Sequence, residues 1–304
     1  MCRKILALLA HFLLSLRYKV ELKGIECLKG KRGALILPNH PAEIDPVILT
    51  VAAWRYIKLR PLVLEKYYFL KWVHAAMKLI QAIPVPDMDT EPGPNKRRRV
   101  FRAMEQTINA IKAGENILLY PAGSVTKAGR ERLGGSSGVY TILQSSPNVP
   151  IILVRTRGLY GSIFSKALTG GVSPDFLVTL WQGFKILLSN LIILAPRREV
   201  RLEFEELPED FPRKGSLVEQ NRWLEQWYDK DGGEQISLIS RKFWKKELPG
   251  IPKVKIPEVD LSEVDSDVID EVVRKIADLS RNPVENIHLN SRLGDDLGLD
   301  SLDA

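Results

Sequence analysis

A histidine and an aspartate, spaced so that they could act together, follow the first strand-like apolar run of the chain. His40 comes after the run Leu35–Leu37, and Asp45 lies five residues later. Such a run predicts a buried strand, and α/β proteins bind ligands at the carboxyl ends of strands. Pro46 suits the first turn of a helix and Asp45 its N-cap, which puts the carboxylate in a good position to hold one ring nitrogen. The pair predicts a general base acting on a substrate hydroxyl, because no serine or cysteine is paired with the histidine. Taken alone, the pair also fits a purely structural histidine.

A second stretch with chemical capacity is LLYPAGSVTKAGRERLGGSSG, residues 118–138, which also follows an apolar run. Its glycines allow the backbone to approach a ligand closely, and its backbone N–H groups and cations can hold an anion. A solvated basic loop is the competing interpretation. The candidate binding residues in this stretch are Gly123, Ser124, Lys127, Arg130 and Arg132.

The elements that must position these residues alternate between strands and helices. Short apolar runs bounded by polar residues, Gly or Pro predict buried strands, and apolar residues at helical spacing predict helices between them. The alternation predicts an α/β fold with a mixed, largely parallel central sheet flanked by helices. The predicted strands are 34–37, 116–120, 150–154 and an edge strand at 200–204, and the predicted helices are 47–54, 67–79 and 100–112.

The composition is that of a globular protein with an anionic partner. The chain has 304 residues and a net charge of +7, and its length fits one large or two smaller domains. Because the basic residues lie beside apolar runs more than beside exposed aromatics, we expect an anionic membrane surface as partner and no nucleic acid. Cys2 and Cys27 form no zinc or redox spacing, which fits a reducing compartment.

Two apolar stretches predict contact with a membrane. Within residues 1–20, the run from Ile5 to Leu16 is too short to span a bilayer, so we expect a helix that associates with the membrane or packs on the domain. Residues 176–195 have the length of a span, but Lys185 at their middle costs about 2.5–3.5 kcal/mol in lipid. An interfacial helix, or a helix lining an acyl-chain site, is favoured over a span. We therefore expect a cytoplasmic protein that is peripherally associated with the membrane.

Three ordered blocks resemble the glycerolipid acyltransferase superfamily, the PlsC-like enzymes that acylate glycerol phosphate and lysophosphatidic acid. NHPAEIDP at residues 39–46 is similar to the family's NHxxxxD block, and YPAGS at 120–124 is similar to its FPEGT block. VPIILV at 149–154 is similar to a block in which a Val-Pro pair opens a strand. The resemblance covers roughly residues 1–230 and implies a glycerol-phosphate acyltransferase-like fold.

The resemblance also implies roles for the residues. His40 would take the proton from the acceptor hydroxyl, Asp45 would orient His40, and the hydroxyl would attack an acyl thioester without the help of a metal. The acceptor would be a lysophospholipid, glycerol phosphate or a related lipid. Ala122 and Val125 stand where the family has glutamate and arginine, and residues 82–86 lack the arginine that ends another block. We therefore expect an acceptor other than plain glycerol 3-phosphate, or a phosphate held by different cations.

The last part of the chain changes in character. Residues 249–257 have the composition of a linker, and residues 258–304 are acidic. Residues 264–304 resemble an acyl carrier protein up to its Asp-Ser-Leu motif, which implies 4′-phosphopantetheine on Ser301 with the acyl chain on its thiol. The later helices of that family do not follow, so we expect a fragment of a longer polypeptide. An acyl-activating ligase often accompanies these two modules and is a further expected partner.

These observations predict four parts and one function. The parts are a membrane-associating or packing helix (1–20), a PlsC-like acyltransferase domain (21–230), a connecting segment and linker (231–263) and a truncated all-α acyl carrier segment (264–304). The expected reaction moves a fatty acyl group from a carrier-protein or coenzyme A thioester to a lipid hydroxyl. A catalytically silent lipid- or carrier-docking module is the first alternative, which the altered blocks favour. A hydrolase that uses the same pair on water is the second.

Overall fold

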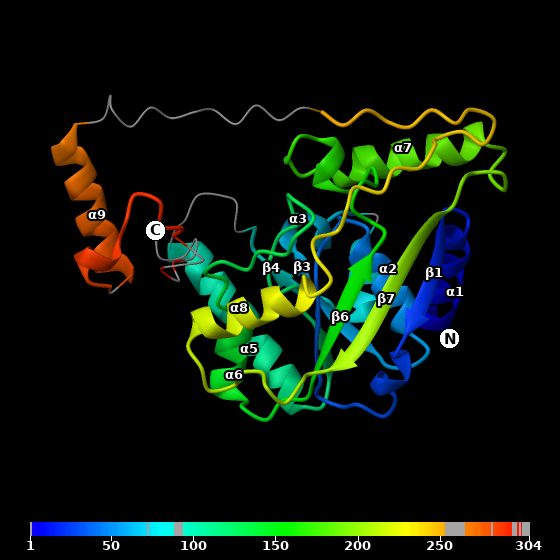
Figure 1. The fold of residues 1–304 in the computed structure, drawn as a ribbon. Helices are drawn as coiled ribbons and strands as arrows, with labels where there is room; N and C mark the ends of the chain where they lie inside the picture. The colour runs from blue at the N-terminus through cyan, green and yellow to red at the C-terminus, as the bar shows by residue number, and fades with distance from the viewer. Residues whose placement is uncertain are drawn as a thin grey trace.

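A mainly parallel sheet lies at the centre of the molecule, between layers of helices (Figure 1). The computed structural model describes residues 2–71, 73–87, 94–252, 265–280, 282–293, 297 and 299. Within these residues seven strands form one sheet in the order β1-β7-β6-β2-β5-β3-β4. The strands are β1 (Tyr18–Lys23), β2 (Leu35–Pro38), β3 (Leu59–Leu64), β4 (Ile83–Val85), β5 (Asn116–Leu118), β6 (Ile151–Arg157) and β7 (Arg198–Glu206).

The pairing of the strands places two functional loops side by side. β2 pairs in parallel with β5 on one side and with β6 on the other. β3 pairs in parallel with β5 and β4, whereas β7 runs antiparallel to β6 and parallel to β1. The carboxyl ends of β2 and β5 are therefore neighbours at one edge of the sheet. The predicted α/β fold with a mixed, largely parallel sheet is confirmed.

Helices cover both faces of the sheet. α2, α5, α7 and α8 each follow a strand along the chain, as expected for α/β layering. The helices in the described part of the chain are α1 (Cys2–Ser15), α2 (Asp45–Ala53), α3 (Glu65–Tyr68), α4 (His74–Ile80), α5 (Pro94–Lys112), α6 (Gly138–Ser145), α7 (Phe176–Ser189), α8 (Leu217–Tyr228) and α9 (Ser266–Ser280), together with short 3-10 turns at Ile25–Leu28, Lys166–Leu168 and Val284–Asn286.

The central strand β2 divides the core into two halves. All four of its residues are buried, as a continuous apolar strand in a parallel sheet requires. Leu35 and Leu37 face one side, where they belong to a cluster with residues of α5, α6 and α8. Ile36 faces the other side and belongs to a cluster with residues of α2. This two-sided burial fixes the position of the residues that follow β2.

Two predictions about individual elements are wrong. The strand predicted as an edge at 200–204 is part of β7, which lies between β1 and β6. The edge is instead β1, because the first helix ends at Ser15 and the chain enters the sheet at Tyr18. The helix predicted over 67–79 is instead two short helices, α3 and α4. A side-chain contact joins them: the Nδ1 atom of His74, at the start of α4, lies 3.0 Å from the carbonyl oxygen of Tyr68, at the end of α3.

The beginning of the segment predicted as a connection packs against the sheet. The Glu234 carboxylate accepts the backbone N–H groups of Gly158, at 2.5 Å, and of Tyr160, at 3.3 Å. The Arg198 guanidinium, at the start of β7, donates to the carbonyl oxygens of Gly158 and Ser237, each at 2.8 Å. These contacts attach the chain after α8 to the loop that follows β6.

The side chain of Asn39 continues the pairing of β2 with β6 beyond Pro38. Its Oδ1 atom accepts the backbone N–H of Thr156 at 2.7 Å, and its Nδ2 atom donates to the carbonyl oxygen of Thr156 at 3.1 Å. Thr156 is fully buried, so water cannot readily replace these partners. Asn39 therefore fixes the backbone immediately before His40.

We predict that Asn39→Ala lowers the free energy of unfolding by about 1–3 kcal/mol, because it leaves a buried N–H and a buried C=O unsatisfied. Thermal and urea unfolding of the purified chain would measure the change. Asn148→Ala, at an exposed turn position before β6, is the matched control and should change stability by less than about 0.5 kcal/mol. An equal effect of both substitutions would contradict this role of Asn39.

Candidate active site

His40 and Asp45 form a hydrogen-bonded pair where β2 ends and α2 begins. The Nδ1 atom of His40 lies 3.0 Å from Oδ2 of Asp45. The Asp45 side chain is 1% exposed and the His40 side chain 12% exposed, so the carboxylate is closed off while the imidazole keeps some access. Because Nδ1 faces the carboxylate, Nε2 is the ring nitrogen left for a substrate.

Both backbone polar groups of His40 are held by the loop that follows β5. Its N–H donates to the carboxylate of Glu131, with distances of 3.3 Å to Oε1 and 3.2 Å to Oε2. Its carbonyl oxygen accepts the N–H of Thr126 at 2.8 Å. The ring of Tyr120 lies beside the imidazole, with 4.2 Å between ring centroids. The two stretches singled out in the sequence are therefore one structural unit.

The environment of His40 favours its protonated form. Burial acts to lower the pKa of the imidazole, but the charge and hydrogen bond of Asp45 outweigh this effect. Glu43 and Glu131 add negative charge nearby, and the pKa of His40 is raised above its usual value. A histidine with a raised pKa is a stronger base once it is deprotonated.

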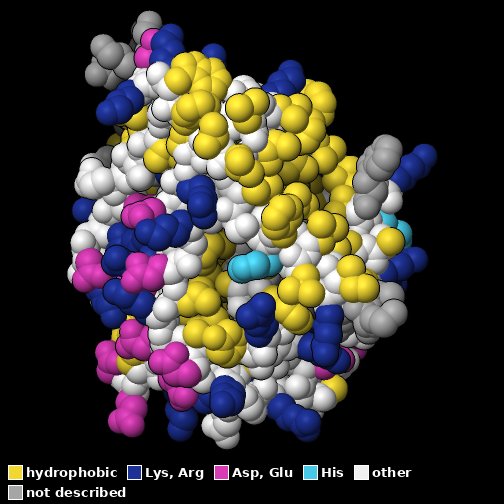
Figure 2. All heavy atoms as spheres, turned by 90° about the vertical axis from the view of Figure 1, so that its right-hand side faces the viewer, with side chains coloured by type: hydrophobic (Ala, Val, Ile, Leu, Met, Phe, Trp, Pro, Cys, Tyr) yellow, Lys and Arg dark blue, Asp and Glu magenta, His cyan; other side chains and the backbone are white. Residues whose placement is uncertain are grey.

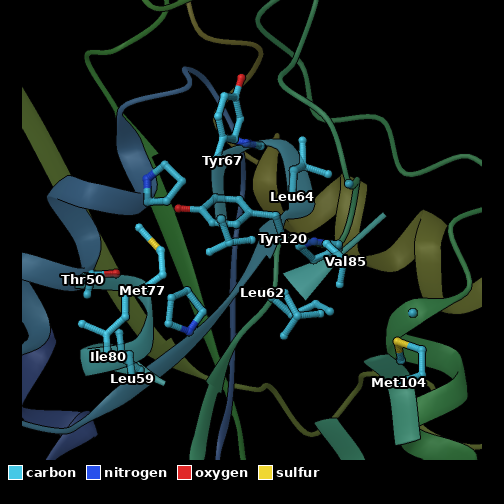
Figure 3. Close-up of a pocket in the computed structure, with 18 of the residues that line it drawn as sticks. Thr50, Leu59, Leu62, Leu64, Tyr67, Met77, Ile80, Val85, Met104 and Tyr120 are labelled. Atoms are coloured by element: carbon cyan, nitrogen blue, oxygen red, sulfur yellow. The ribbon is translucent and has the colours of Figure 1, made fainter. Parts of the chain in front are cut away.

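His40 is one of the residues that line a large, mainly apolar groove of about 1620 Å³. Figure 3 shows side chains from several elements around this space, with the ring of Tyr120 at its centre. β3 contributes Leu59, Leu62 and Leu64, and α4 contributes Met77 and Ile80. Thr50 of α2, Val85 of β4 and Met104 of α5 complete the set labelled in Figure 3, together with Tyr67.

Two of the predicted binding residues line the same groove as His40. Gly123 and Ser124 border it, both exposed. Gly123 has a φ of 65°, a left-handed conformation that side chains disfavour, and its N–H already donates to the carbonyl oxygen of Tyr120 at 3.0 Å. Ser124 is thus the residue of this pair with a hydroxyl to offer to a ligand.

The other predicted binding residues lie elsewhere on the loop. Lys127, Arg130 and Arg132 are exposed, and none of them is among the described residues that line the groove. Arg132 forms an ion pair of 3.4 Å with Glu225 of α8. Ser301 lies outside the described residues. The structure therefore brings together His40, Asp45, Gly123 and Ser124 from the predicted set and separates the three cations from them.

Sequence reasoning missed Glu131. It sits between two arginines in a stretch that reads as a basic loop, yet it is 2% exposed. Burial raises the pKa of its carboxyl to about 8, against the opposing effect of the hydrogen bond from the His40 backbone. A single acid among cations was the only signal in the sequence, and its inward orientation is a tertiary property.

Tyr120 was also missed as a polar group. Its hydroxyl and the Oδ1 atom of Asp45 are buried and have no hydrogen-bond partner within the described structure. Burial, followed by the nearby charge of Asp45, raises the pKa of Tyr120 well above its ordinary value. The phenol therefore stays neutral and can donate a hydrogen bond beside the His40 ring.

Among the described residues, no three His, Cys, Asp or Glu side chains are grouped as metal ligands would be.

A comparison with protein families matches the part of the chain that contains the site. Residues 19–156 match the family model described as Acyltransferase. The match runs from β1 almost to the end of β6 and includes His40, Asp45 and the loop after β5. This match supports the predicted class of enzyme, an acyltransferase.

A comparison with solved structures gives matches that include a lipid acyltransferase. The crystal structure of the 1-acyl-sn-glycerophosphate (LPA) acyltransferase PlsC from Thermotoga maritima matches with 15% sequence identity and a TM-score of 0.46, over 70% of this chain and 70% of that chain. Similarity at this level leaves the substrates of the present chain to be argued from its own site. A search of curated proteins gave no significant match.

We predict that the buried carboxyl of Glu131 makes the fold less stable as the pH rises. Its pKa is raised from 4.5 to about 8 on folding, so the folded chain keeps a proton that the unfolded chain releases. This contribution to stability is complete below pH 4.5 and is lost as the pH rises to about 8. Glu131→Gln keeps an acceptor for His40 and removes the titration.

Melting temperatures of wild type and Glu131→Gln at pH 5.5 and pH 8.5 test this prediction. The variant should gain stability relative to wild type between the two pH values. Glu209→Gln, at an exposed position, should show no such gain. A Glu131→Gln difference that is the same at both pH values would show that the carboxyl is ionised in the folded protein.

Proposed function

We propose that the chain transfers a fatty acyl group from a thioester to a hydroxyl of a lipid acceptor, with His40 as general base. One observation carries the proposal. His40, whose Nδ1 lies 3.0 Å from Asp45, lines an apolar groove large enough for an alkyl chain. A base on the wall of an apolar groove suits a substrate with a long hydrocarbon tail and a reacting polar end.

The reaction follows from the arrangement of the pair. Nε2 of His40 takes the proton of the acceptor hydroxyl as its oxygen attacks the thioester carbonyl carbon. The tetrahedral intermediate then collapses, the C–S bond breaks, and the imidazolium returns the proton to the leaving thiolate. Asp45 stabilises the imidazolium by charge and by its hydrogen bond. The hydroxyls of Ser124 and Tyr120 are the nearby donors that the developing oxyanion could use.

The acceptor is proposed to be a lysophospholipid, glycerol phosphate or a related lipid. Ala122 lines the groove and Val125 is buried, so neither position supplies the acid or the cation that the resemblance associates with phosphate binding. The exposed cations Lys127, Arg130 and Arg132 lie on the same loop outside the groove. They would meet a headgroup that projects from the groove and not a phosphate held inside it.

The donor is proposed to be an acyl carrier protein, with coenzyme A thioesters as the alternative. Within the carrier-like segment, Ala277, Ile287 and Leu297 form a small buried cluster. Val268 and Val272 of α9 stay about half exposed, an apolar face that needs a further covering element. Phosphopantetheine on Ser301 would supply the thiol that carries the acyl chain; an acyl-activating ligase is proposed as the source of that chain.

A catalytically silent docking module is the alternative function. The substitutions at Ala122 and Val125 favour it, whereas the direct contact between His40 and Asp45 favours the enzyme. A silent module would not need a buried carboxylate, an oriented imidazole and two further hydrogen bonds on the His40 backbone. The intact pair therefore supports catalysis more strongly than the altered positions oppose it.

We predict that His40→Ala lowers kcat/KM for acyl transfer by about 10²–10⁴, the usual contribution of a general base. In wild type, the rate should rise with pH through an apparent pKa above 6.5, because the neutral imidazole is the active form and its pKa is raised. Asp45→Asn should reduce the rate and move this limb to lower pH, because it removes the negative charge that raises the pKa. Mass spectrometry of products from acyl-loaded carrier, acyl-CoA and a lipid extract gives the rates.

The identity of the product separates the alternatives. Acylated lipid that disappears in His40→Ala supports the transferase and names the acceptor. Free fatty acid in place of acylated lipid would identify a hydrolase. A folded wild-type protein that turns over neither donor would contradict the enzyme and favour the docking module.

We further propose that the protein associates with an anionic membrane through α1, α7 and the residues after α7. No helix in the described part of the chain combines the length and hydrophobicity that crossing a bilayer requires. Figure 2 shows hydrophobic side chains gathered on the face that carries α1 and α7, with Lys and Arg side chains around them. The most exposed of these hydrophobic residues are Ile5, Leu9, Phe12, Val178, Trp181, Leu191 and Ile193.

The chemistry of this apolar face suits the interface of a bilayer. Trp181 stacks on Phe184 at 5.3 Å, and the Lys185 ammonium lies 5.6 Å from the Trp181 ring. Aromatic rings beside lysines are the residues that membrane interfaces favour. A continuous apolar area of this kind is larger than single exposed residues require and indicates a binding surface.

We predict that Trp181→Glu combined with Ile193→Glu weakens binding to anionic vesicles at least about tenfold, because lost apolar burial of about 1.4 kcal/mol already gives that factor. Co-sedimentation with phosphatidylglycerol-containing vesicles would measure it. Leu289→Glu, an exposed leucine of the carrier-like segment, is the matched control and should bind like wild type. Equal binding of all three proteins would exclude this face as the membrane surface.

A further inference from the structure

We propose that the first two turns of α5 are the docking surface for the acidic carrier-like segment of the chain. The inference rests on the proposed function, since a carrier must present its acyl chain at the groove. It adds the location of the surface, the residues that form it and the partner that occupies it.

The start of α5 carries a dense positive charge. Five of the seven residues from 96 to 102 are Lys or Arg. Arg98 and Arg102 are exposed and four residues apart, so they lie on one face of the helix. Arg99 is partly committed, since it pairs with Glu65 of α3 at 2.8 Å. Phe101 is 70% exposed in the middle of these cations, an arrangement typical of a binding surface rather than of a solvated helix face.

The same turns form one rim of the apolar groove. Arg97, Val100 and Phe101 line it, and Met104 and Ile108 continue this lining along the next turns of α5. The groove also contains His40. A partner bound to the start of α5 therefore sits where an acyl chain can enter the groove and reach the catalytic pair.

The carrier-like segment has the complementary charge. Residues 258–304 contain 13 Asp and Glu residues against four Lys and Arg residues. On α9, the acidic residues Asp267, Asp270, Glu271 and Asp278 are all exposed. Opposite potentials of this kind raise the rate at which two surfaces meet and orient the encounter.

One residue of the segment already reaches the groove. Leu299, two positions before Ser301, lines the same groove as Arg97 and Phe101. Its N–H donates to the carbonyl oxygen of Leu293 at 2.9 Å, and its side chain packs against the small carrier-like cluster. Leu299 and the start of α5 therefore border the same groove, as docking of the segment at this rim would require.

The charged rim and the apolar membrane face are separate surfaces. In Figure 1, α5 lies to the left of the sheet, and α1 and α7 lie to its right and above it. The hydrophobic residues proposed to contact lipid belong to α1 and α7 and not to α5. A carrier can thus occupy the α5 rim while the protein stays on a membrane.

Donor competition gives the first test. Transfer from a palmitoyl-loaded, complete acyl carrier protein and from palmitoyl-CoA would be measured with wild type and with Arg98→Glu combined with Arg102→Glu. We expect the ratio of kcat/KM for the carrier donor to that for the coenzyme A donor to fall at least tenfold. The wild-type ratio should also fall as salt is raised from 50 to 500 mM, because screening weakens the encounter.

A matched control uses cations at the opposite end of β2. Lys29 and Arg32 are exposed in the loop before this strand, whereas His40 follows it. Lys29→Glu combined with Arg32→Glu makes the same charge change and should leave the donor ratio as in wild type. A donor ratio that falls equally in both double variants, or in neither, would overturn the proposal. The proposal would also be overturned if Arg98→Glu combined with Arg102→Glu lost vesicle binding without a change in donor ratio.

A second measurement does not depend on activity. The two native cysteines are first removed by Cys2→Ser and Cys27→Ser. In that background, a flexible bismaleimide should cross-link the cysteines introduced by Phe101→Cys and Leu299→Cys. The yield of the cross-linked product should fall in high salt. Lys29→Cys with Leu299→Cys is the control pair. Equal yields for the two pairs would overturn the docking site. If the Phe101 position cross-links but the wild-type protein transfers no acyl group, the docking surface would be supported and the proposed function rejected.

Discussion

The site depends on how the backbone of His40 is held. Its N–H is bound by the buried carboxylate of Glu131 and its C=O by the N–H of Thr126, so the loop after β5 grips the residue from both sides. Asn39 adds a third attachment, to β6, through the backbone of Thr156. Three neighbouring parallel strands thereby fix one histidine. A histidine held in this way would need little reorganisation to act as the proposed base.

Holding His40 in this way requires acidic side chains to be buried. Glu131 and Asp45 are both closed off from water, and burial raises the pKa of Glu131 to about 8. The Asp45 carboxylate is compensated on one oxygen by His40, while Oδ1 has no partner within the described structure. Uncompensated buried polar atoms are rare away from functional sites. Asp45 Oδ1 and the Tyr120 hydroxyl are two such atoms in the described structure, and both belong to residues that contact the His40 ring.

In the proposed function, three surfaces around the site have different roles in handling a lipid substrate. The groove is lined by apolar side chains and by His40, the α1 and α7 face carries exposed hydrophobic side chains, and the start of α5 carries positive charge. The α1 and α7 face and the start of α5 both border this groove, since Lys4 and Phe101 are among its lining residues. In the proposed reaction, a lipid acceptor and an acidic donor protein would approach the same groove from these two surfaces.

Local patterns in the sequence were sufficient for the alternation of strands and helices, the largely parallel sheet and the pairing of His40 with Asp45. Continuous apolar runs such as Leu35–Leu37 mark strands buried on both faces, and a proline after Asp45 marks the start of a helix. Such signals depend on a few neighbouring residues. They could not reveal that β7 is an interior strand, because edge position depends on where the distant β1 pairs.

Only the tertiary structure decided which residues of the loop that follows β5 face His40. The sequence presented Lys127, Arg130 and Arg132 as equal candidates, and all three are exposed away from the groove. Glu131, hidden among them, turns inward and its side chain accepts the His40 N–H, while its own backbone N–H donates to Asp229 after α8 at 3.4 Å. The direction of a side chain in an irregular loop has no period that a sequence can display. It is set by hydrogen bonds to residues far away in the chain, and those exist only once the sheet has formed.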